Sequence, residues 1–194
     1  MARPAIAGMV VLMMSGVDAD LLFWALARTT GIGSFAALAI GVLTGIALRT
    51  ATLDWLASNR AVKALHVWTQ VLWLPLGALH LLTTWLDRTA RVGLIDLVIP
   101  FGVGYGPLAI GLGTLAFDLF AVVAITSWAR ERMDLRVWRW IHRSSYVAYA
   151  LTFAHAVLSG SDFSSPAISA IAWATAFGLG VLMISRLLWG RLPQ

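Results

Sequence analysis

The sequence predicts an all-α membrane protein, a six-transmembrane-helix bundle whose first helix is short. Hydrophobic residues form 60% of the 194-residue chain, charged residues form only 12%, and the mean hydropathy is +0.83. Soluble domains carry about 25% charged residues. Because one helix needs about 20 apolar residues to cross a bilayer, five or six spans leave only short loops. We therefore expect one membrane domain over residues 1–194, with its core at about 20–190 and no soluble flavin or nucleotide domain.

Two further features of the composition limit the possible functions. The chain has no cysteine, which excludes disulfides, iron–sulfur ligation and thiol catalysis. The net charge of +5 also suits nucleic-acid binding, but the basic residues cluster in loops beside apolar segments. In such chains this clustering reflects membrane topology. We expect the lipid bilayer, and no nucleic acid, as a partner.

The first span is predicted at residues 5–14, an apolar run that follows Arg3 and ends at Ser15 and Gly16. A basic start, a short apolar run and small residues are also typical of a signal peptide, so this alternative stays open. We favour a short span, which a tilt or a locally thin bilayer accommodates.

Five further spans follow from the longer apolar runs. The second begins at an N-cap, Asp18 or Asp20, and the third contains Pro75, which is expected to bend it. Residues 87–106 are expected to form an ordered connection at the membrane interface. The predicted spans are 20–48, 61–85, 107–128, 137–158 and 166–188.

Basic residues predict the orientation because cytoplasmic loops are rich in Lys and Arg. Most of them fall on one side of the predicted spans: Arg3, Arg49, Arg60, Lys63, Arg130, Arg132, Arg136, Arg139, Arg186 and Arg191. With six spans both termini lie in the cytoplasm. With five spans the amino terminus lies outside and the rest is unchanged.

Four histidines, all in apolar segments, are the candidate functional residues. His66 and His80 are 14 residues apart on one predicted helix, a rise of about 21 Å, and lie within about 40° of one face. His142 and His155 are 13 residues apart, a rise of about 19.5 Å, but about 140° from a common face in an ideal helix. A bend, local overwinding or opposite rotamers must reconcile that rotation.

Two helices with histidines at two matched levels favour two stacked b-type haems. Imidazoles coordinate haem iron from both faces, and an iron saturated in this way suits electron transfer better than substrate binding. Zinc needs four converging ligands, which histidines so far apart do not provide. A single such histidine is more often a packing residue, but four matched histidines favour haem.

Haem propionates need cations or hydrogen-bond donors. Arg28 lies at the depth of the outer haem, where a propionate would offset its cost in the membrane. Anchoring to lipid phosphate is an equal alternative for each inner candidate. The candidates at the inner haem are Arg60, Lys63, Arg139 and Arg143.

Asp118 lies near the middle of the fourth predicted span. A carboxylate at this depth is typical of a proton relay or a quinol site. The simpler interpretation, which we favour, is a protonated side chain that is hydrogen-bonded to a neighbour.

The spacings His-x13-His and His-x12-His resemble the ferric reductase-like transmembrane domain (cytochrome b558-like), which ferric reductases, NADPH oxidases and the haem subunit of the bacterial methionine sulfoxide reductase system share. The similarity covers about residues 20–190. Two motifs add to it, Leu26-Ala27-Arg28-Thr29-Thr30-Gly31 and Trp138-Arg139-Trp140-Ile141-His142.

The resemblance implies that His66 and His142 bind the inner haem iron, that His80 and His155 bind the outer one, and that Arg28 lies near the outer haem. It implies an oxidoreductase component of a bacterial cytoplasmic (inner) membrane. Electrons would pass from a cytoplasmic donor protein, quinol or a partner's flavin to an extracytoplasmic ferric chelate, oxygen or partner oxidoreductase. A haem sensor or haem-handling protein, and a quinol-oxidising cytochrome b subunit, remain the alternatives.

Overall fold

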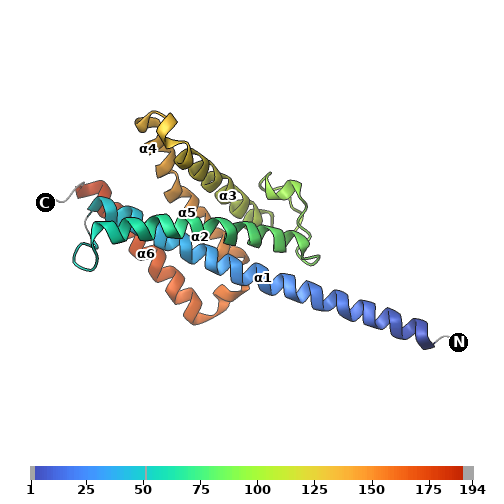
Figure 1. Ribbon diagram of the computed structural model, residues 1–194. Coiled ribbons are helices and arrows are strands. Elements are labelled where there is room, and N and C mark those ends of the chain that lie inside the picture. The colour runs from blue at the N-terminus through green and yellow to red at the C-terminus, as the bar shows by residue number, and fades with distance from the viewer. Residues whose placement is uncertain (1–2, 51, 190–194) are drawn as a thin grey trace.

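The computed structural model describes the backbone of residues 3–50 and 52–189 and the side chains of residues 19–50, 52–185 and 188. These residues form α-helices joined by loops and short 3-10 turns, and they contain no strand. The helices are α1 (Arg3–Thr50), α2 (Asn59–Leu86), α3 (Pro107–Trp128), α4 (Leu135–Arg143), α5 (Ser145–Ser159) and α6 (Pro166–Trp189) (Figure 1). The turns are η1 (Ile95–Leu97), η2 (Arg130–Arg132) and η3 (Ser161–Ser164).

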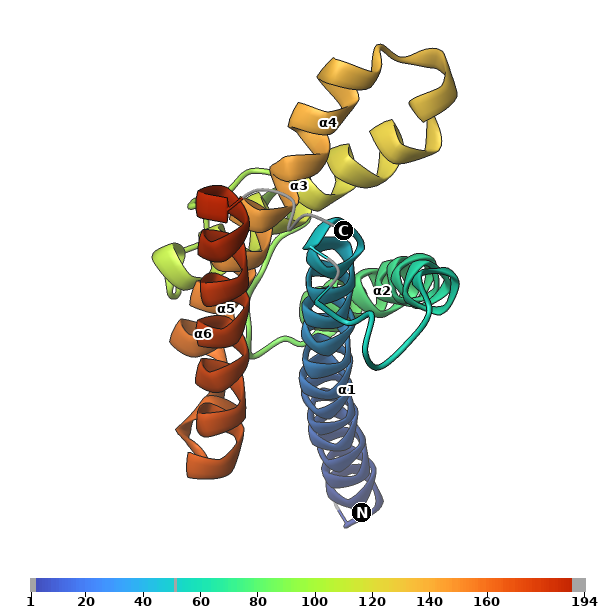
Figure 2. The ribbon, with the colours of Figure 1, turned by 90° about the vertical axis from the view of Figure 1, so that its left-hand side faces the viewer.

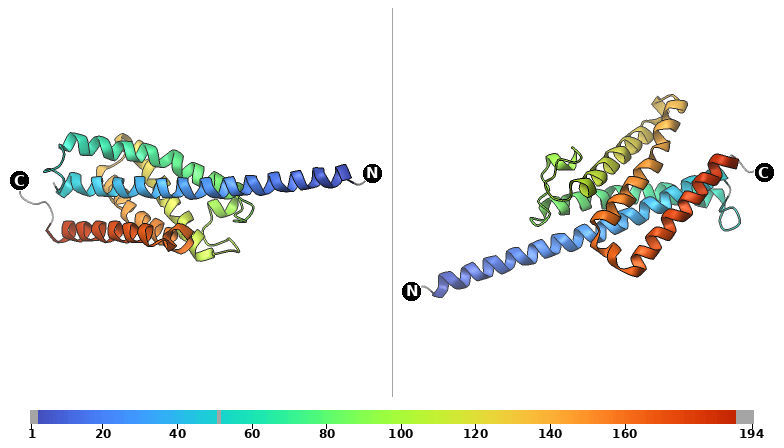
Figure 3. Two further views of the ribbon diagram at one scale, coloured as in Figure 1. Left: turned by 90° about the horizontal axis from the view of Figure 1, so that it is seen from below. Right: turned by 180° about the vertical axis from the view of Figure 1, so that it is seen from behind.

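Helix α1 is the central element of the bundle. Figure 2 shows α2 on one side of it and α6 on the other, and Figure 3 shows that the first part of α1 extends past all other helices. Helices α3 and α5 pack side by side, and α5 also contacts α1. The core lies where these helices meet, with Leu38 and Ile46 of α1 against Trp73, Phe120 and Tyr149.

The chain is a multi-pass membrane protein by the length and composition of its helices. Among the described residues, four helical segments are long and apolar enough to cross a bilayer: Ala19–Thr50, Asn59–Leu86, Pro107–Trp128 and Pro166–Ser185. Large apolar side chains such as Phe177 and Ile171, 75% and 69% exposed, cover the outside of the bundle. Such a continuous apolar surface suits lipid rather than water.

The prediction of six spans was wrong, and the first reason lies in α1. The predicted break at Ser15 and Gly16 is absent, because α1 runs without interruption from Arg3 to Thr50. Glycine within a helix costs only about 1 kcal/mol relative to alanine, and serine costs less. Asp18 and Asp20 are therefore internal helical residues rather than N-caps.

The second reason is that predicted span 137–158 is divided at Ser144 into α4 and α5. The Ser144 hydroxyl donates a hydrogen bond to the Ile141 carbonyl (2.6 Å), a local bond of the kind that competes with a regular helix. With 15 residues, α5 is shorter than the roughly 17 residues that a span requires. The break also provides a bend between His142 and His155.

The other predicted spans are confirmed to within a few residues. Segment 107–128 coincides with α3, 61–85 lies within α2, and 166–188 lies within α6. Pro75 is accommodated inside α2, which stays a single helix.

We predict that Gly111→Ala lowers the melting temperature of the detergent-solubilised protein, as followed by circular dichroism. A Cβ at Gly111 would lie 2.6 Å from the backbone nitrogen of Phe101, so the loop before α3 has to move. Overpacking of this kind costs about 1–3 kcal/mol. The control is Gly178→Ala, where a Cβ meets no atom within 4 Å. Equal melting temperatures for the two variants would contradict the prediction.

Candidate functional site

The four histidines form two pairs. His66 of α2 lies beside His142 of α4, with ring centroids 6.3 Å apart and ring planes at 71°. His80 of α2 lies beside His155 of α5 with the same centroid distance and the same angle. Since 14 residues of α2 separate His66 from His80, the two pairs lie about 21 Å apart along that helix. We call them the inner pair (His66 and His142) and the outer pair (His80 and His155).

Three of the imidazoles are held by backbone carbonyls of a neighbouring helix. His80 Nδ1 lies 2.8 Å from the Ala27 carbonyl oxygen, and His155 Nδ1 lies 2.8 Å from that of Ala109. His66 Nδ1 lies 2.9 Å from the Gly41 carbonyl oxygen. Because a carbonyl only accepts, Nδ1 carries the proton in each ring and Nε2 has the lone pair. Metal-binding histidines are oriented in this way, with the second nitrogen donating to a carbonyl.

A glycine one helical turn after each of these carbonyls gives the imidazole room. A Cβ would lie 2.6 Å from His155 Nδ1 at Gly113 and 3.0 Å from His80 Nδ1 at Gly31. At Gly45 it would lie 3.3 Å from His66 Cε1. We call Gly31, Gly45 and Gly113 the glycine seats.

The fourth histidine has a serine where the others have a seat. The Ser127 hydroxyl lies 3.5 Å from His142 Nδ1. Ser127 follows Gly113 by 14 residues, as Gly45 follows Gly31. Helices α1 and α3 therefore carry small residues with the same spacing, which matches the spacing of the histidines in α2.

The distance between paired rings fits one metal ion between two imidazoles. A metal–imidazole nitrogen bond is about 2.0 Å and the ring centre lies about 1.1 Å further on, so ligands on opposite sides have centres about 6 Å apart. Among the described residues no three His, Cys, Asp or Glu side chains come together, so each site offers two protein ligands. A haem, which brings four nitrogens of its own, suits such a site.

Trp138 supports this fit at the inner pair. Its indole stacks on His142 with centroids 4.9 Å apart, and the Arg130 guanidinium lies 4.8 Å from the Trp138 ring centroid. The Trp138 Nε1 atom is buried and has no hydrogen-bond partner among the described residues. A buried donor without an acceptor costs about 1–3 kcal/mol, and a haem carboxylate is the type of acceptor that it needs. The sequence analysis did not identify Trp138 or Arg130 as site residues.

An aromatic layer separates the two histidine pairs. Trp73 lies seven residues from both His66 and His80, and its ring centroid is 5.3 Å from that of Phe120. In the same core cluster Phe35 stacks on Tyr149, with ring centroids 5.6 Å apart. Trp73, Phe120 and Tyr149 are all buried. Buried aromatic rings thus lie between the two pairs, and one of them carries the Tyr149 hydroxyl, which has no hydrogen-bond partner among the described residues.

Arg28 lies at the level of the outer pair, next to Ala27, whose carbonyl holds His80. Its partner in the structure is Asp162 of η3, which accepts a hydrogen bond from Arg28 Nε at 2.7 Å and a second one from Nη2. The hydrogen bond from Arg28 holds the pKa of the Asp162 carboxyl below its usual range, and the positive charge adds to this effect. The pair joins α1 to the turn before α6. Arg28 therefore has a carboxylate partner within the protein and does not depend on a haem propionate for one.

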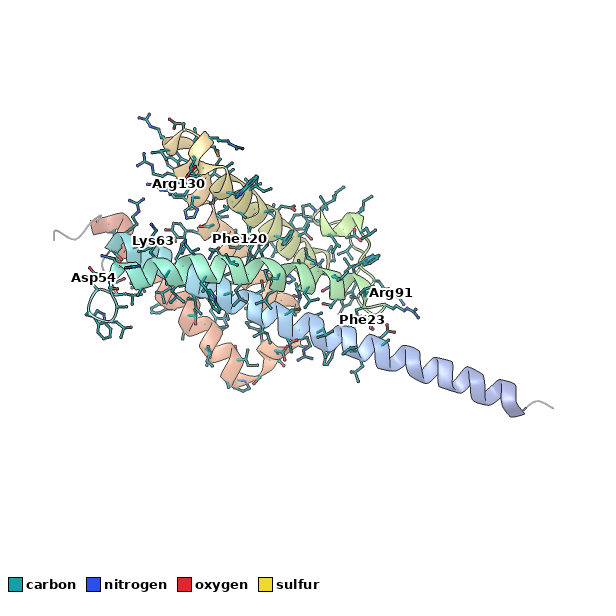
Figure 4. All side chains as sticks on the ribbon, in the orientation of Figure 1. Phe23, Asp54, Lys63, Arg91, Phe120 and Arg130 are labelled. Atoms are coloured by element: carbon teal, nitrogen blue, oxygen red, sulfur yellow. The ribbon has the colours of Figure 1, made fainter. Side chains whose placement is uncertain are left out.

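The remaining candidates lie around the inner pair or along α3. Lys63 and Arg130 both lie at the inner end of the bundle (Figure 4). The Arg139 Nε donates to the Leu135 carbonyl (2.9 Å), and Arg143 lies over the Trp140 ring. Asp118 is partly buried on α3 and forms no ion pair among the described residues. The predicted inner cations are exposed: Arg60, Lys63, Arg139 and Arg143.

Comparisons with protein-family models, with curated proteins and with solved structures gave no match. The resemblance to the ferric reductase-like transmembrane domain therefore stays a prediction. The site offers two levels, each with two facing imidazoles, inside a membrane protein.

We predict that Gly113→Ala weakens one of two metalloporphyrin-binding steps by about 10–100-fold, the usual effect of disturbing a partner of a metal ligand. The new methyl group pushes the His155 ring away from the Ala109 carbonyl. Titration with haem, followed by absorbance, measures the effect. Gly180→Ala is the control because its Cβ meets no atom within 4 Å. Unchanged binding in Gly113→Ala would contradict the role of the seat.

We predict that Asp162→Asn removes an acid-sensitive part of the stability. A carboxyl whose pKa is lowered in the folded state stabilises the protein above its unfolded pKa, about 3.9 for Asp, and this stability is lost as the pH falls through the lowered value. The gap in melting temperature between wild type and variant is therefore constant near neutral pH and narrows below about pH 4. Asp54→Asn, at an exposed carboxylate outside this pair, is the control. A gap that does not depend on pH would contradict the prediction.

Proposed function

We propose that the protein carries electrons across a membrane through two b-type haems, one at each histidine pair. One observation carries the proposal: both pairs have ring centroids 6.3 Å apart. His66 and His142 would bind the inner iron, and His80 and His155 the outer iron. Haem, when bound, supplies reversible one-electron chemistry. The chain orients the ligands, keeps water out and places the two levels on one path.

The ligand arrangement favours electron transfer over chemistry at the iron. Each haem iron would be held by two imidazoles, His66 with His142 and His80 with His155, and would then have no open position for a substrate. Electrons would enter from a cytoplasmic donor protein, from quinol or from a partner's flavin. They would leave to an extracytoplasmic acceptor, such as a ferric chelate, oxygen or a partner oxidoreductase. The aromatic layer at Trp73, Phe120 and Tyr149 lies on the line between the two levels.

The excess of Lys and Arg at one end of the helices supports an orientation for this proposal. In this proposal the four long apolar helices each cross once, and α4 and α5, each too short to cross alone, together make a fifth crossing. The amino terminus is then outside and the carboxyl terminus in the cytoplasm of a bacterial cell. The loops at residues 52–58 and 129–134 would be cytoplasmic, because Lys and Arg are in excess beside them. The outer pair accordingly faces the extracytoplasmic side.

The first experiment is a haem-to-protein ratio with oxidised and dithionite-reduced spectra of the purified protein. We predict two low-spin b haems per chain, and one in His80→Ala, because that variant loses a ligand of the outer iron only. Trp68→Phe, at an exposed residue of the same helix, is the control and keeps both haems.

Two results would contradict this function. One is that His80→Ala retains both haems with unchanged spectra. The other is that the wild-type protein, expressed with haem supplied, binds none.

A further inference from the structure

A cavity of about 430 Å³ lies on the extracytoplasmic side of the outer pair, under the orientation proposed above. It is lined by Asp20 of α1, by Arg88, Thr89 and Arg91 after the end of α2, and by Tyr105 before α3. Asp20 precedes Ala27, which holds His80, by seven residues, or about 10 Å along α1. Figure 4 shows Arg91 at this end of the molecule, near Phe23.

The lining of the cavity suits an anion. Two guanidinium groups and one carboxylate line it, and the hydroxyl of Tyr105 adds a hydrogen-bond donor. Within the described part of the chain neither Arg88 nor Arg91 has a carboxylate at ion-pair distance. Guanidinium groups bind carboxylate and phosphate through two parallel hydrogen bonds, and so recognise them by shape as well as by charge.

Buried anchors hold the loop that carries these groups. Asp87 is buried, and its Oδ1 accepts hydrogen bonds from the Thr89 backbone N–H (2.8 Å) and hydroxyl (2.5 Å). Val92, directly after Arg91, and Val103, two residues before Tyr105, are each only 5% exposed.

Arg91 itself has a φ of 50°, in the left-handed region that side-chain-bearing residues rarely adopt. Backbone strain of this kind gathers at ligand sites, where the surrounding structure maintains it. The loop therefore has a defined backbone conformation at Arg91, from which an exposed guanidinium side chain extends.

The carboxylate of Asp20 favours an anion that also carries a hydroxyl group. A carboxylate in a cationic pocket repels a bare polyanion but accepts a hydrogen bond from a ligand hydroxyl. The volume of about 430 Å³ falls in the range of small-molecule sites. An oxyanion that carries a hydroxyl group can bind the two arginines through its charge and donate a hydrogen bond from the hydroxyl to Asp20.

We propose that this cavity binds a small oxyanion, carboxylate or phosphate, that also carries a hydroxyl group. A soluble hydroxycarboxylate and the headgroup of phosphatidylglycerol share this chemistry. The site itself depends only on the loop geometry. Its role in delivering an acceptor or an effector beside the outer pair rests on the proposed function.

The test is isothermal titration of the full-length protein, purified in a neutral detergent, with citrate and with tricarballylate, which lacks the hydroxyl of citrate. We expect citrate to bind more tightly than tricarballylate, and Asp20→Asn to reduce that preference. Arg88→Gln and Arg91→Gln each weaken citrate binding by about 10-fold or more, because each removes a charge-assisted contact. Arg136→Gln, at an exposed arginine of α4 outside this cavity, is the control and binds citrate as wild type does.

Nanodiscs separate the two sources of the ligand. Citrate binding that persists in phosphatidylcholine nanodiscs supports a soluble ligand. Citrate binding that is lost in phosphatidylglycerol nanodiscs, and that none of the variants above restores, supports the lipid headgroup. If neither citrate nor phosphatidylglycerol shows binding that depends on Arg88 and Arg91, the site does not exist. The haem content of Arg88→Gln is read in parallel, so that failure of the anion site and failure of the haem assignment are distinguishable.

Discussion

The hydrogen bond from an imidazole Nδ1–H to a backbone carbonyl of the neighbouring helix is the constraint on which the rest of the site depends. It requires a carbonyl on the facing side of that helix and a very small residue one turn later. Helix α1 meets this requirement twice, at Gly31 and Gly45, and α3 meets it at Gly113. His66, His80 and His155 are thereby fixed in tautomer and direction. Under the proposed function, this lowers the entropy that metal binding would have to overcome.

These hydrogen bonds divide the bundle into two similar units. In each unit, a helix that provides the glycine seats is followed by an antiparallel segment that carries the histidines. The units are α1 with α2, and α3 with α4 and α5. The outer seat comes first in both units, at Gly31 and at Gly113, and the inner position follows 14 residues later, at Gly45 and at Ser127. The two units face each other so that one histidine from each meets at every level. This organisation explains why both pairs have the same centroid distance and angle.

Much of the fold could be predicted because long apolar runs and the spacing of four histidines are local signals. The glycine seats were not predicted, because helix packing explains a glycine equally well in a sequence. Other features depend on tertiary contacts. Arg28 and Asp162, for example, are 134 residues apart. The stacking of Trp138 on His142, by contrast, is a local contact between residues four apart on α4. The prediction of six spans was wrong partly because it ended a helix at Ser15 and Gly16, two residues that only weakly destabilise a helix.

The two levels differ in their electrostatic surroundings, and this bears on the direction of electron flow. Under the proposed function, Arg130 and the exposed cations near the inner pair would stabilise a reduced inner haem, whereas the Arg28–Asp162 pair near the outer level is neutral overall. Taken alone, this difference would hold an electron at the inner level. The membrane potential acts in the opposite sense, because moving one charge through 100 mV is worth about 2.3 kcal/mol and the cytoplasm is the negative side. Under the proposed function, the potential would drive electrons outward through the aromatic layer without any large difference in intrinsic affinity between the two haems.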